Sequence, residues 1–354
     1  MTIKNKKEEL DCPSPFIHSA AKIVIICSAT KYCLKKASIC LFFPSYFFGY
    51  AYLCAQMTAL RHTTRGLAAF HLVAVAIVGI WGLTFISTKL LIGRGMSPHE
   101  IFLLRFSMAY AGIWFLSSRR LWADSWRDEL WLLLGGVTGG SFYFLTENTA
   151  LEFTLATNVS FLVCTTPLLT ALLSLGLYRD VKATRGLIGG SLVALAGVAL
   201  VVCNGHFVLR LSPAGDLLSL LAALSWAVYS LVMRRMGGRY DVVFITRKIF
   251  FYGVLTILPV FLVRPWQFDV SCLLDTSVLF HLLFLGVLAS LVCFAVWNVV
   301  LKRLGTVQAS NYIYLNPVFT LAGSALVLGE RLTPMAWMGV ALILGGVYWA
   351  GRGK

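Results

Sequence analysis

The feature that most constrains the fold is a series of ten apolar stretches, each close to the ~20 residues that an α-helix needs to cross a bilayer. They lie at about residues 70–92, 99–118, 130–150, 155–177, 186–203, 215–233, 243–263, 278–300, 307–328 and 333–350. Charged residues make up only 13% of the chain, whereas soluble domains carry about 25%. Unbroken apolar runs also differ from the alternating pattern of barrel strands. The sequence therefore predicts an all-α polytopic membrane protein.

Basic residues between these stretches gather in alternate loops. One set of loops holds fifteen of them, namely Arg61, Arg65, Arg119, Arg120, Arg127, Arg179, Lys182, Arg185, Arg234, Arg235, Arg239, Lys302, Arg303, Arg352 and Lys354. The other set holds four, namely Arg94, Arg210, Arg264 and Arg331. Because basic loops stay in the cytoplasm, both termini are expected there. Anionic lipid and the membrane potential then account for the net charge of +15, and no nucleic-acid partner is expected.

An internal repeat relates the two halves of the chain. Residues 151–189 align without a gap on residues 301–339. The matched pairs include Asn148–Asn298, Ser160–Ser310, Pro167–Pro317, Thr170–Thr320 and, at a slightly smaller offset, Trp81–Trp226. Each half would contain five crossings, and an odd number inverts the second half relative to the first. The expected fold is ten transmembrane helices in two inverted five-helix repeats, at residues 67–203 and 204–354.

Residues 1–66 form an N-terminal extension outside both repeats, and we do not expect it to belong to the core fold. Its apolar segment, residues 39–60, is long enough for an eleventh helix. A crossing there would place the seven lysines of residues 4–36 outside the cell, against the charge pattern of every later loop. The preferred interpretation is that the working protein begins near Met57, and an extra helix is the weaker alternative.

Charged residues inside the apolar stretches are candidates for function, because burying one costs about 2.5–3.5 kcal/mol on insertion scales. Glu147 is the only carboxylate well inside a stretch. It either titrates a proton or binds a cation, or it pairs with a base at the helix end. Arg105 lies deep in its stretch and is a candidate for holding an anionic group such as a carboxylate. Lys89, Arg247 and Lys248 lie near helix ends, where long side chains reach the interface.

Prolines, aromatic residues and amides complete the candidate set. Pro167 and Pro317 lie mid-helix at matching positions, where a proline bends the helix and frees a backbone carbonyl. Such breaks line the substrate path of carriers, although a packing kink is the alternative. Trp81 and Trp226 either form walls of a cavity or pack within the bundle. The other candidates for solute contact are Asn148, Asn158, Tyr229, Asn298, Tyr312 and Asn316.

Motifs for catalysis or metal binding are absent from the sequence. It contains no HExxH, GxSxG or P-loop motif and no paired intramembrane aspartates, so an enzyme is not expected. The nine cysteines form no CxxC pair, which argues against a metal site and a disulfide framework. No cofactor is expected, and ATP does not drive the protein directly.

Several short motifs follow one another in both halves of the chain, namely Ile80-Trp81-Gly82, Thr149-Ala150-Leu151, Ala156-Thr157-Asn158, Thr166-Pro167-Leu168, Ala223-Leu224-Ser225-Trp226-Ala227, Leu315-Asn316-Pro317-Val318 and Leu328-Gly329-Glu330. Together they resemble the EamA family of the drug/metabolite transporter superfamily. The resemblance covers residues 68–352. It implies two inverted five-helix repeats around a central cavity, and transport of small metabolites across a bacterial inner membrane. Tyr178-Arg179-Asp180 departs from the Leu-Gly-Glu that usually ends the first repeat.

The leading hypothesis is a secondary carrier, in the first place an exporter, for a small metabolite or an amino-acid-like solute. Its partners would be the small-molecule solute and the lipid bilayer, and a homodimer is an open alternative to a single copy. The competing hypotheses are an intramembrane enzyme and a non-transporting assembly or lipid-handling protein. The substrate, the direction of transport and the coupling ion do not follow from the sequence.

The inverted-repeat fold predicts the sidedness of the loops. Topology reporters fused after Lys182 and after Phe207 should report opposite sides of the membrane, with Lys182 in the cytoplasm, because one crossing separates them. Reporters on the same side would contradict this fold.

Overall fold

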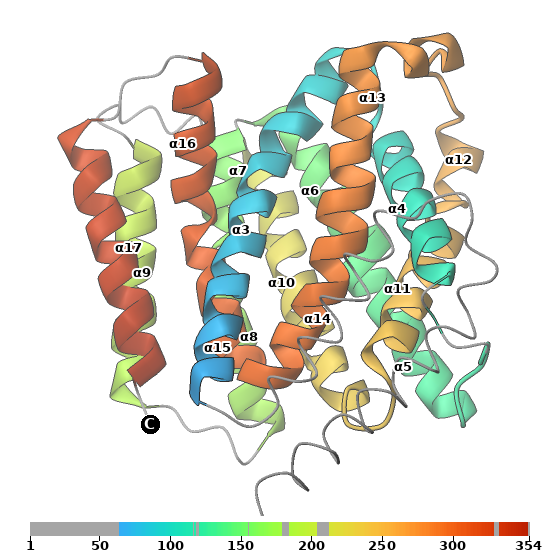
Figure 1. Ribbon diagram of the computed structural model, residues 1–354. Coiled ribbons are helices and arrows are strands. Elements are labelled where there is room, and N and C mark those ends of the chain that lie inside the picture. Colours follow the sequence, from blue (N-terminus) through green and yellow to red (C-terminus); the bar gives the residue numbers. More distant parts are fainter. Residues whose placement is uncertain are drawn as a thin grey trace, which may run out of the picture. The chain divides into compact units, whose positions relative to one another are not determined.

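The computed structural model describes residues 64–115, 117, 120–154, 156–178, 184–203, 212–328 and 333–352 (Figure 1). The chain divides into two compact units, Met1–Gly66 and Leu67–Lys354, and nearly all described residues belong to the second. The expectations for the N-terminal extension fall on residues outside the described ranges and stay predictions. The described residues form helices and no strand.

The helices follow the predicted apolar stretches. Those of the first half are α3 (Thr64–Gly93), α4 (Pro98–Trp114), α5 (Trp126–Gly136), the π-helix η2 (Val137–Ser141), α6 (Phe142–Phe153), α7 (Ala156–Val163), α8 (Thr166–Leu177) and α9 (Arg185–Cys203). Those of the second half are α10 (Pro213–Met236), α11 (Val242–Ile257), α12 (Val260–Val263), the 3-10 helix η3 (Val270–Leu274), α13 (Thr276–Leu283), the π-helix η4 (Phe284–Val292), α14 (Cys293–Leu304), α15 (Thr306–Ser310), the 3-10 helix η5 (Asn311–Leu315), α16 (Asn316–Leu328) and α17 (Pro334–Arg352). Each predicted stretch coincides with one helix or with consecutive helical segments.

Five helical segments are long and apolar enough to cross a membrane. They are Ala68–Gly93, Asn158–Leu177, Pro213–Met236, Val242–Val263 and Thr276–Leu304. Arg185–Leu200 and Trp337–Gly351 are apolar but shorter. These segments agree with a multi-pass membrane protein, while the number of ten crossings and the inversion of the repeats stay predictions.

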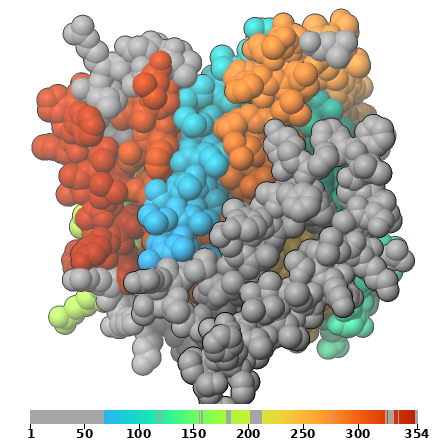
Figure 2. Space-filling view, in the orientation of Figure 1, coloured from blue at the N-terminus to red at the C-terminus, as the bar shows by residue number. Residues whose placement is uncertain are grey.

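Apolar side chains cover outward-facing parts of the bundle. On α3, Leu72, Leu83 and Leu90 are all exposed, and Figure 2 shows α3 at the surface between the red C-terminal helices and the orange α13. Trp337 and Trp349 of α17 are exposed as well. Such a surface is unfavourable in water, but lipid tails accommodate it, which fits helices that satisfy their backbone polar groups internally.

Polar side chains fix the points at which helices begin. At the start of α4 the Glu100 carboxylate accepts a hydrogen bond from the backbone N–H of Ser97 at 2.8 Å. Its other oxygen accepts from the N–H groups of Gln267 and Phe268 at 2.6 and 3.1 Å. Glu100 therefore fastens the first turn of α4 to the segment before η3. Side chains that cap other helices are Ser125, Ser212, Asp241 and Asp275.

Four of the helical runs are interrupted near their middle. The turn between α7 and α8 comes directly before Pro167, and η5 ends directly before Asn316 and Pro317. Proline lacks the N–H that would continue the helical hydrogen bonds, so the sequence explains both interruptions. The π-helices η2 and η4 interrupt the other two runs. The repeat offset that lays Leu151 on Leu301 also lays η2 inside η4.

The last helices of the two halves, α9 and α17, pack closely against each other (Figure 1). A Cβ atom on Gly190 would lie 2.4 Å from the backbone nitrogen of Ala350, and one on Gly346 would lie 2.4 Å from that of Ala194. Both distances are too short for a side chain. Small residues let membrane helices approach until their backbones touch, and these glycines do so here.

Helices from both halves also meet in the rest of the bundle. The helix α10 packs on α6, and α11 packs on α4, α5 and η2. A Cβ on Gly136 would lie 2.4 Å from the Cβ of Tyr252, so α5 and α11 also approach closely. The interior between α3, α4, α6, α10 and α16 is consequently built from both halves of the chain.

Substitution of Gly346 tests the close packing of α9 and α17. Gly346→Leu should destabilise the protein by about 1–3 kcal/mol, the usual cost of overpacking, because a backbone cannot move aside as a side chain can. Gly345→Leu is the matched control, since a Cβ there meets nothing within 4 Å. Thermal denaturation in detergent should show a lower Tm for Gly346→Leu alone, and equal Tm values for both variants would contradict this packing.

Candidate functional site

A central cavity lies between helices of the two halves. Its lining residues are Trp81, Thr84 and Phe85 of α3, Arg105 of α4, Tyr143, Phe144 and Glu147 of α6, Val163 of α7, Thr166 of α8, Trp226 of α10, Ile313 of η5 and Asn316 of α16. The enclosed cavity has a volume of ≈ 30 Å³, and the wider space that includes its open mouth has a volume of ≈ 430 Å³. A solute larger than water therefore enters only when side chains move.

Both helix interruptions at proline reach this cavity. Thr166 and Asn316, which line it, directly precede Pro167 and Pro317. These four residues occupy equivalent positions in the internal repeat. The two proline breaks thus bring one polar side chain from each half to the same space.

Arg105 supplies a buried positive charge to the cavity. Its side chain is almost fully buried, its Nε–H donates to the Ser290 hydroxyl at 2.9 Å, and its Cζ lies 4.2 Å from the centroid of the Phe144 ring. Within the described ranges its Nη1 and Nη2 groups have no hydrogen-bond partner. Serine and phenylalanine therefore orient the guanidinium while leaving its fork of N–H donors unused.

Glu147 supplies the opposite charge from the neighbouring helix. It is 7% exposed, and the Tyr143 hydroxyl donates to its Oε1 at 2.6 Å. Its Oε2 accepts no hydrogen bond from any residue that the structure describes. Arg105 and Glu147 line the same cavity without forming an ion pair with each other.

Aromatic rings close part of the cavity wall. The Trp81 and Trp226 rings meet edge to face with centroids 5.3 Å apart, and the centroid of the Trp297 ring, which is not part of the lining, lies 5.1 Å from that of Trp81. The Trp81 indole donates to the backbone oxygen of Ala289 at 3.1 Å. The buried Trp226 Nε1 and Asn316 Oδ1 have no partner among the described residues. Two of the lining residues thus each carry a buried polar atom without a partner, one donor and one acceptor.

Five of the ten candidate binding residues therefore line the central cavity, namely Trp81, Arg105, Glu147, Trp226 and Asn316. The others make contacts elsewhere. Tyr229 donates to Asn298, whose amide donates to Thr246 at 2.8 Å. The amides of Asn148 and Asn158 donate to Pro98 O and Thr154 Oγ1, and Tyr312 pairs with His71. For these other five residues, contact with the solute stays a prediction.

Two residues that position the charges were not among the sequence candidates. Tyr143 precedes Glu147 by one helical turn on the same helix face, so its spacing could have indicated the contact. Ser290 lies 185 residues from Arg105, and no local pattern connects them.

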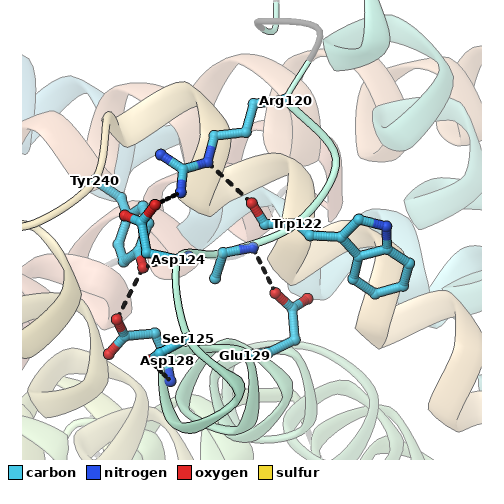
Figure 3. A network of polar contacts seen from close by, with 8 residues as sticks. Arg120, Trp122, Asp124, Ser125, Asp128, Glu129 and Tyr240 are labelled. Atoms are coloured by element: carbon cyan, nitrogen blue, oxygen red, sulfur yellow. Dashed lines mark hydrogen bonds and ion pairs between the residues drawn. The ribbon is translucent and has the colours of Figure 1, made fainter.

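A second polar cluster, the loop network, lies where the α4–α5 and α10–α11 loops meet (Figure 3). The Lys248 ammonium and the Tyr252 hydroxyl both donate to Glu129 Oε1, and Ala123 N–H donates to Oε2 at 2.8 Å. Lys248 is 4% exposed, so the expectation that it reaches out to the interface is wrong. Its cation is instead satisfied by a buried carboxylate, which leaves it no role in the central cavity.

Asp128 extends the loop network on the same turn of α5. Its carboxylate accepts from Arg239 at 2.8 Å. It also accepts from Tyr240 at 2.8 Å, and the Tyr240 hydroxyl in turn accepts from Asp124 N–H at 2.9 Å (Figure 3). The hydrogen bond from Tyr240, followed by those from Ser125 and Arg239, holds the pKa of Asp128 below its usual value. The first turn of α5 is thereby fixed to the α10–α11 loop.

Lys89 also has a structural partner. Its ammonium donates to the backbone oxygens of Leu151 and Thr154 at 2.6 and 3.0 Å, which are at the end of α6. A cation there complements the negative end of the helix dipole. Arg247 similarly donates to the backbone oxygen of Arg120.

Comparisons with known proteins identify relatives of the chain. A model of the EamA-like transporter family matches residues 67–203 and again residues 213–352. An uncharacterized transporter of Archaeoglobus fulgidus is 27% identical over 282 residues, which cover 78% of this chain and 96% of that protein. A probable amino-acid metabolite efflux pump of Escherichia coli is 27% identical, covering 78% of this chain and 92% of that protein. A probable terminal-alkyne amino-acid exporter of Streptantibioticus cattleyicolor is 27% identical, and the match covers 62% of this chain and 72% of that protein.

A solved structure shares the fold. The chain in that crystal structure superposes on this one with a TM-score of 0.64 at 19% sequence identity. The match covers 81% of this chain and 97% of that one.

Substitution of Lys248 tests the loop network. Lys248→Met should destabilise the protein by about 3–5 kcal/mol at neutral pH, because it leaves a buried carboxylate without its cation. Lys302→Met is the matched control on an exposed lysine. Thermal denaturation in detergent should show a lower Tm for Lys248→Met only, and an unchanged Tm would contradict the buried pair.

The same variants should show a pH dependence. Burial pushes the pKa of Glu129 upward, but hydrogen bonds from Lys248, Tyr252 and Ala123 outweigh it and keep the pKa below its usual value. The stabilisation is therefore present above the unfolded-state pKa of about 4.3 and lost as pH falls through the lower folded-state pKa. The Tm difference between wild type and Lys248→Met should shrink below about pH 4.

Proposed function

Because the chain belongs to the EamA-like transporter family and is a multi-pass membrane transporter, we propose that it is a secondary active exporter. Its solute would be a small metabolite of amino-acid-like chemistry, carried across the bacterial inner membrane with both termini in the cytoplasm. The names of the E. coli and S. cattleyicolor relatives support the class of solute and the direction of transport.

The central cavity is the observation that carries this proposal. It lies inside the bundle, is lined by both halves of the chain, and contains Arg105 and Glu147 buried without a mutual ion pair. Burying two charges in an apolar bundle is costly, and pairing them would offset part of that cost. A pair held open is expected where another charged group binds.

The internal repeat suggests how the cavity reaches both sides of the membrane. In carriers built from inverted repeats, exchange of the two repeat conformations opens a fixed site to opposite sides. The breaks before Pro167 and Pro317 lie at the cavity wall, and the π-helices η2 and η4 interrupt neighbouring runs at equivalent positions. π-helical segments often mark functional sites, so we propose that these four breaks take up the motion.

An ion gradient would drive the transport, since the sequence carries no P-loop. We propose that Glu147 couples the solute to protons. A carboxylate in an apolar site is tolerated more easily when it is protonated, so its proton occupancy can change with the side that it faces. Arg105 stays charged under all relevant conditions and holds an anionic group of the solute.

Flux through reconstituted vesicles tests the proposed function. A thermal-shift screen of the purified protein against a metabolite library first selects the solute. Vesicles with an imposed pH gradient should then move that solute in a protein-dependent and gradient-dependent manner. Glu147→Gln should flatten the pH dependence of the flux while the protein stays in the membrane, because glutamine cannot take up a proton.

Glu152→Gln is the matched control, as Glu152 is exposed on the same helix. It should keep the wild-type pH profile. If Glu147→Gln transports at the wild-type rate with the wild-type pH profile, the acid has a structural role and proton coupling through it fails. The absence of flux for every solute that stabilises the protein would contradict transport itself.

A further inference from the structure

We propose that the central cavity binds a zwitterion, namely an α-amino acid with a free amino group, a free carboxylate and an apolar side chain. The carboxylate would bind to the Nη groups of Arg105, the ammonium to Oε2 of Glu147, and the side chain to the aromatic wall. This inference rests on the proposed function, because it names the solute of the same site.

The unused hydrogen-bonding capacity of Arg105 matches a carboxylate. A guanidinium has five N–H donors, and only the Nε–H is taken, by Ser290. The two Nη groups form the planar fork that binds a carboxylate through two parallel hydrogen bonds. The Phe144 ring, 4.2 Å from Cζ, restricts the plane of the guanidinium, so this fork is already oriented before the solute arrives.

The unused capacity of Glu147 matches an ammonium group. Tyr143 holds Oε1 at 2.6 Å, and the second oxygen has no partner within the described part of the chain. A tyrosine O–H is the donor here, and because it is neutral it brings no positive charge into contact with the carboxylate. An ammonium group can donate to Oε2 and neutralise that charge.

Charge balance selects a solute that carries both groups. A neutral solute would desolvate both Arg105 and Glu147 without replacing their lost interactions with water. A solute with only an anion or only a cation would satisfy one of them and leave the other buried and unpaired, which is strongly unfavourable. A zwitterion satisfies both at once and keeps the occupied cavity neutral.

Each of the two charges is positioned by its own hydrogen bond. Ser290 holds Arg105 from η4, and Tyr143 holds Glu147 from its own helix. Lys248 and Glu129 of the loop network, by contrast, form a direct ion pair. A zwitterion that bridges Arg105 and Glu147 would give each of them the charged hydrogen-bond partner that Lys248 and Glu129 find in each other.

The rest of the wall indicates an apolar side chain. Trp81, Phe85, Val163, Trp226 and Ile313 line the cavity beside the two charges. Burying apolar area contributes about 25 cal/mol per Å². The wall should therefore bind leucine, methionine, phenylalanine or tryptophan more tightly than polar amino acids. The unpartnered Trp226 Nε1 and Asn316 Oδ1 are buried, and they would become hydrogen-bond partners of the solute only after the lining side chains move.

Binding of modified amino acids to the purified full-length protein tests the proposal. The probes are leucine, methionine, phenylalanine and tryptophan, each also as the methyl ester, which lacks the anion, and as the N-acetyl derivative, which lacks the cation. Calorimetric titration in detergent should show that wild type binds at least one free amino acid tenfold or more tightly than both of its derivatives. If no free amino acid binds, or if the derivatives bind equally well, the inference is overturned.

Two variants test which residue binds the carboxylate of the solute and which binds its ammonium group. Arg105→Gln should abolish the preference for the free acid over the ester but keep the discrimination against the N-acetyl form. Glu147→Gln should do the reverse, and Lys302→Gln should change neither preference. If both variants weaken the binding of all ligands equally, the two residues do not distinguish the charged groups of the solute, and the assignment fails.

Further variants cover the case in which Arg105→Gln does not fold. Ser290→Ala removes only the hydrogen bond that orients Arg105, and Tyr143→Phe only the one that orients Glu147. The first should reduce the acid-over-ester preference several-fold, and the second should reduce the discrimination against N-acetylation. Unchanged preferences in both would overturn the proposal.

The binding experiment and the flux experiment test the zwitterion site and the proposed transport separately. Amino-acid binding with the predicted pattern but no flux in vesicles would contradict transport and leave the binding site intact. Flux of a different solute, with no binding of the amino-acid probes, would contradict the zwitterion site and leave transport intact.

Discussion

The interior of this bundle offers a charged side chain no water, so every buried charge needs a partner from the protein, a proton or a solute. Lys248 and Glu129 satisfy each other, and Lys89 satisfies the backbone at the end of α6. Within the described part of the chain, Arg105 and Glu147 differ from these, since each has one positioning hydrogen bond and further hydrogen-bonding groups without a partner at a shared cavity. This contrast is the basis for proposing them as the groups that bind the solute.

The two halves supply a similar scaffold and different chemistry. Thr166 and Asn316 reach the cavity from equivalent breaks, and Trp81 and Trp226 meet edge to face within it. The position equivalent to Glu147 is occupied by Trp297, which packs against Trp81. The matched breaks therefore bring polar side chains of both halves to the cavity, while the unmatched Glu147 gives it one acidic side.

Local patterns predicted much of this architecture. Apolar length located the helices, proline located two of their interruptions, and the cost of burying charge singled out Arg105 and Glu147. The same reasoning failed for Lys248, because its partner Glu129 lies 119 residues away and the contact forms only when α5 packs on α11. It could not foresee that Tyr229 donates a hydrogen bond to Asn298 across 69 residues of sequence, and contact of either residue with the solute stays a prediction. Depth in an apolar stretch shows that a polar group needs a partner, and only the packed helices show which partner it has.

The most direct measurement of the central claim is solute protection inside the cavity. Thr84, a lining residue, is replaced by cysteine in a protein whose nine native cysteines are changed to alanine, and the rate of its reaction with a small thiol reagent is followed. A saturating apolar amino acid should slow this reaction several-fold, and Arg105→Gln should remove the protection. An equal reaction rate with and without the amino acid, at concentrations that saturate binding, would contradict the claim that the solute occupies the space between Arg105 and Glu147.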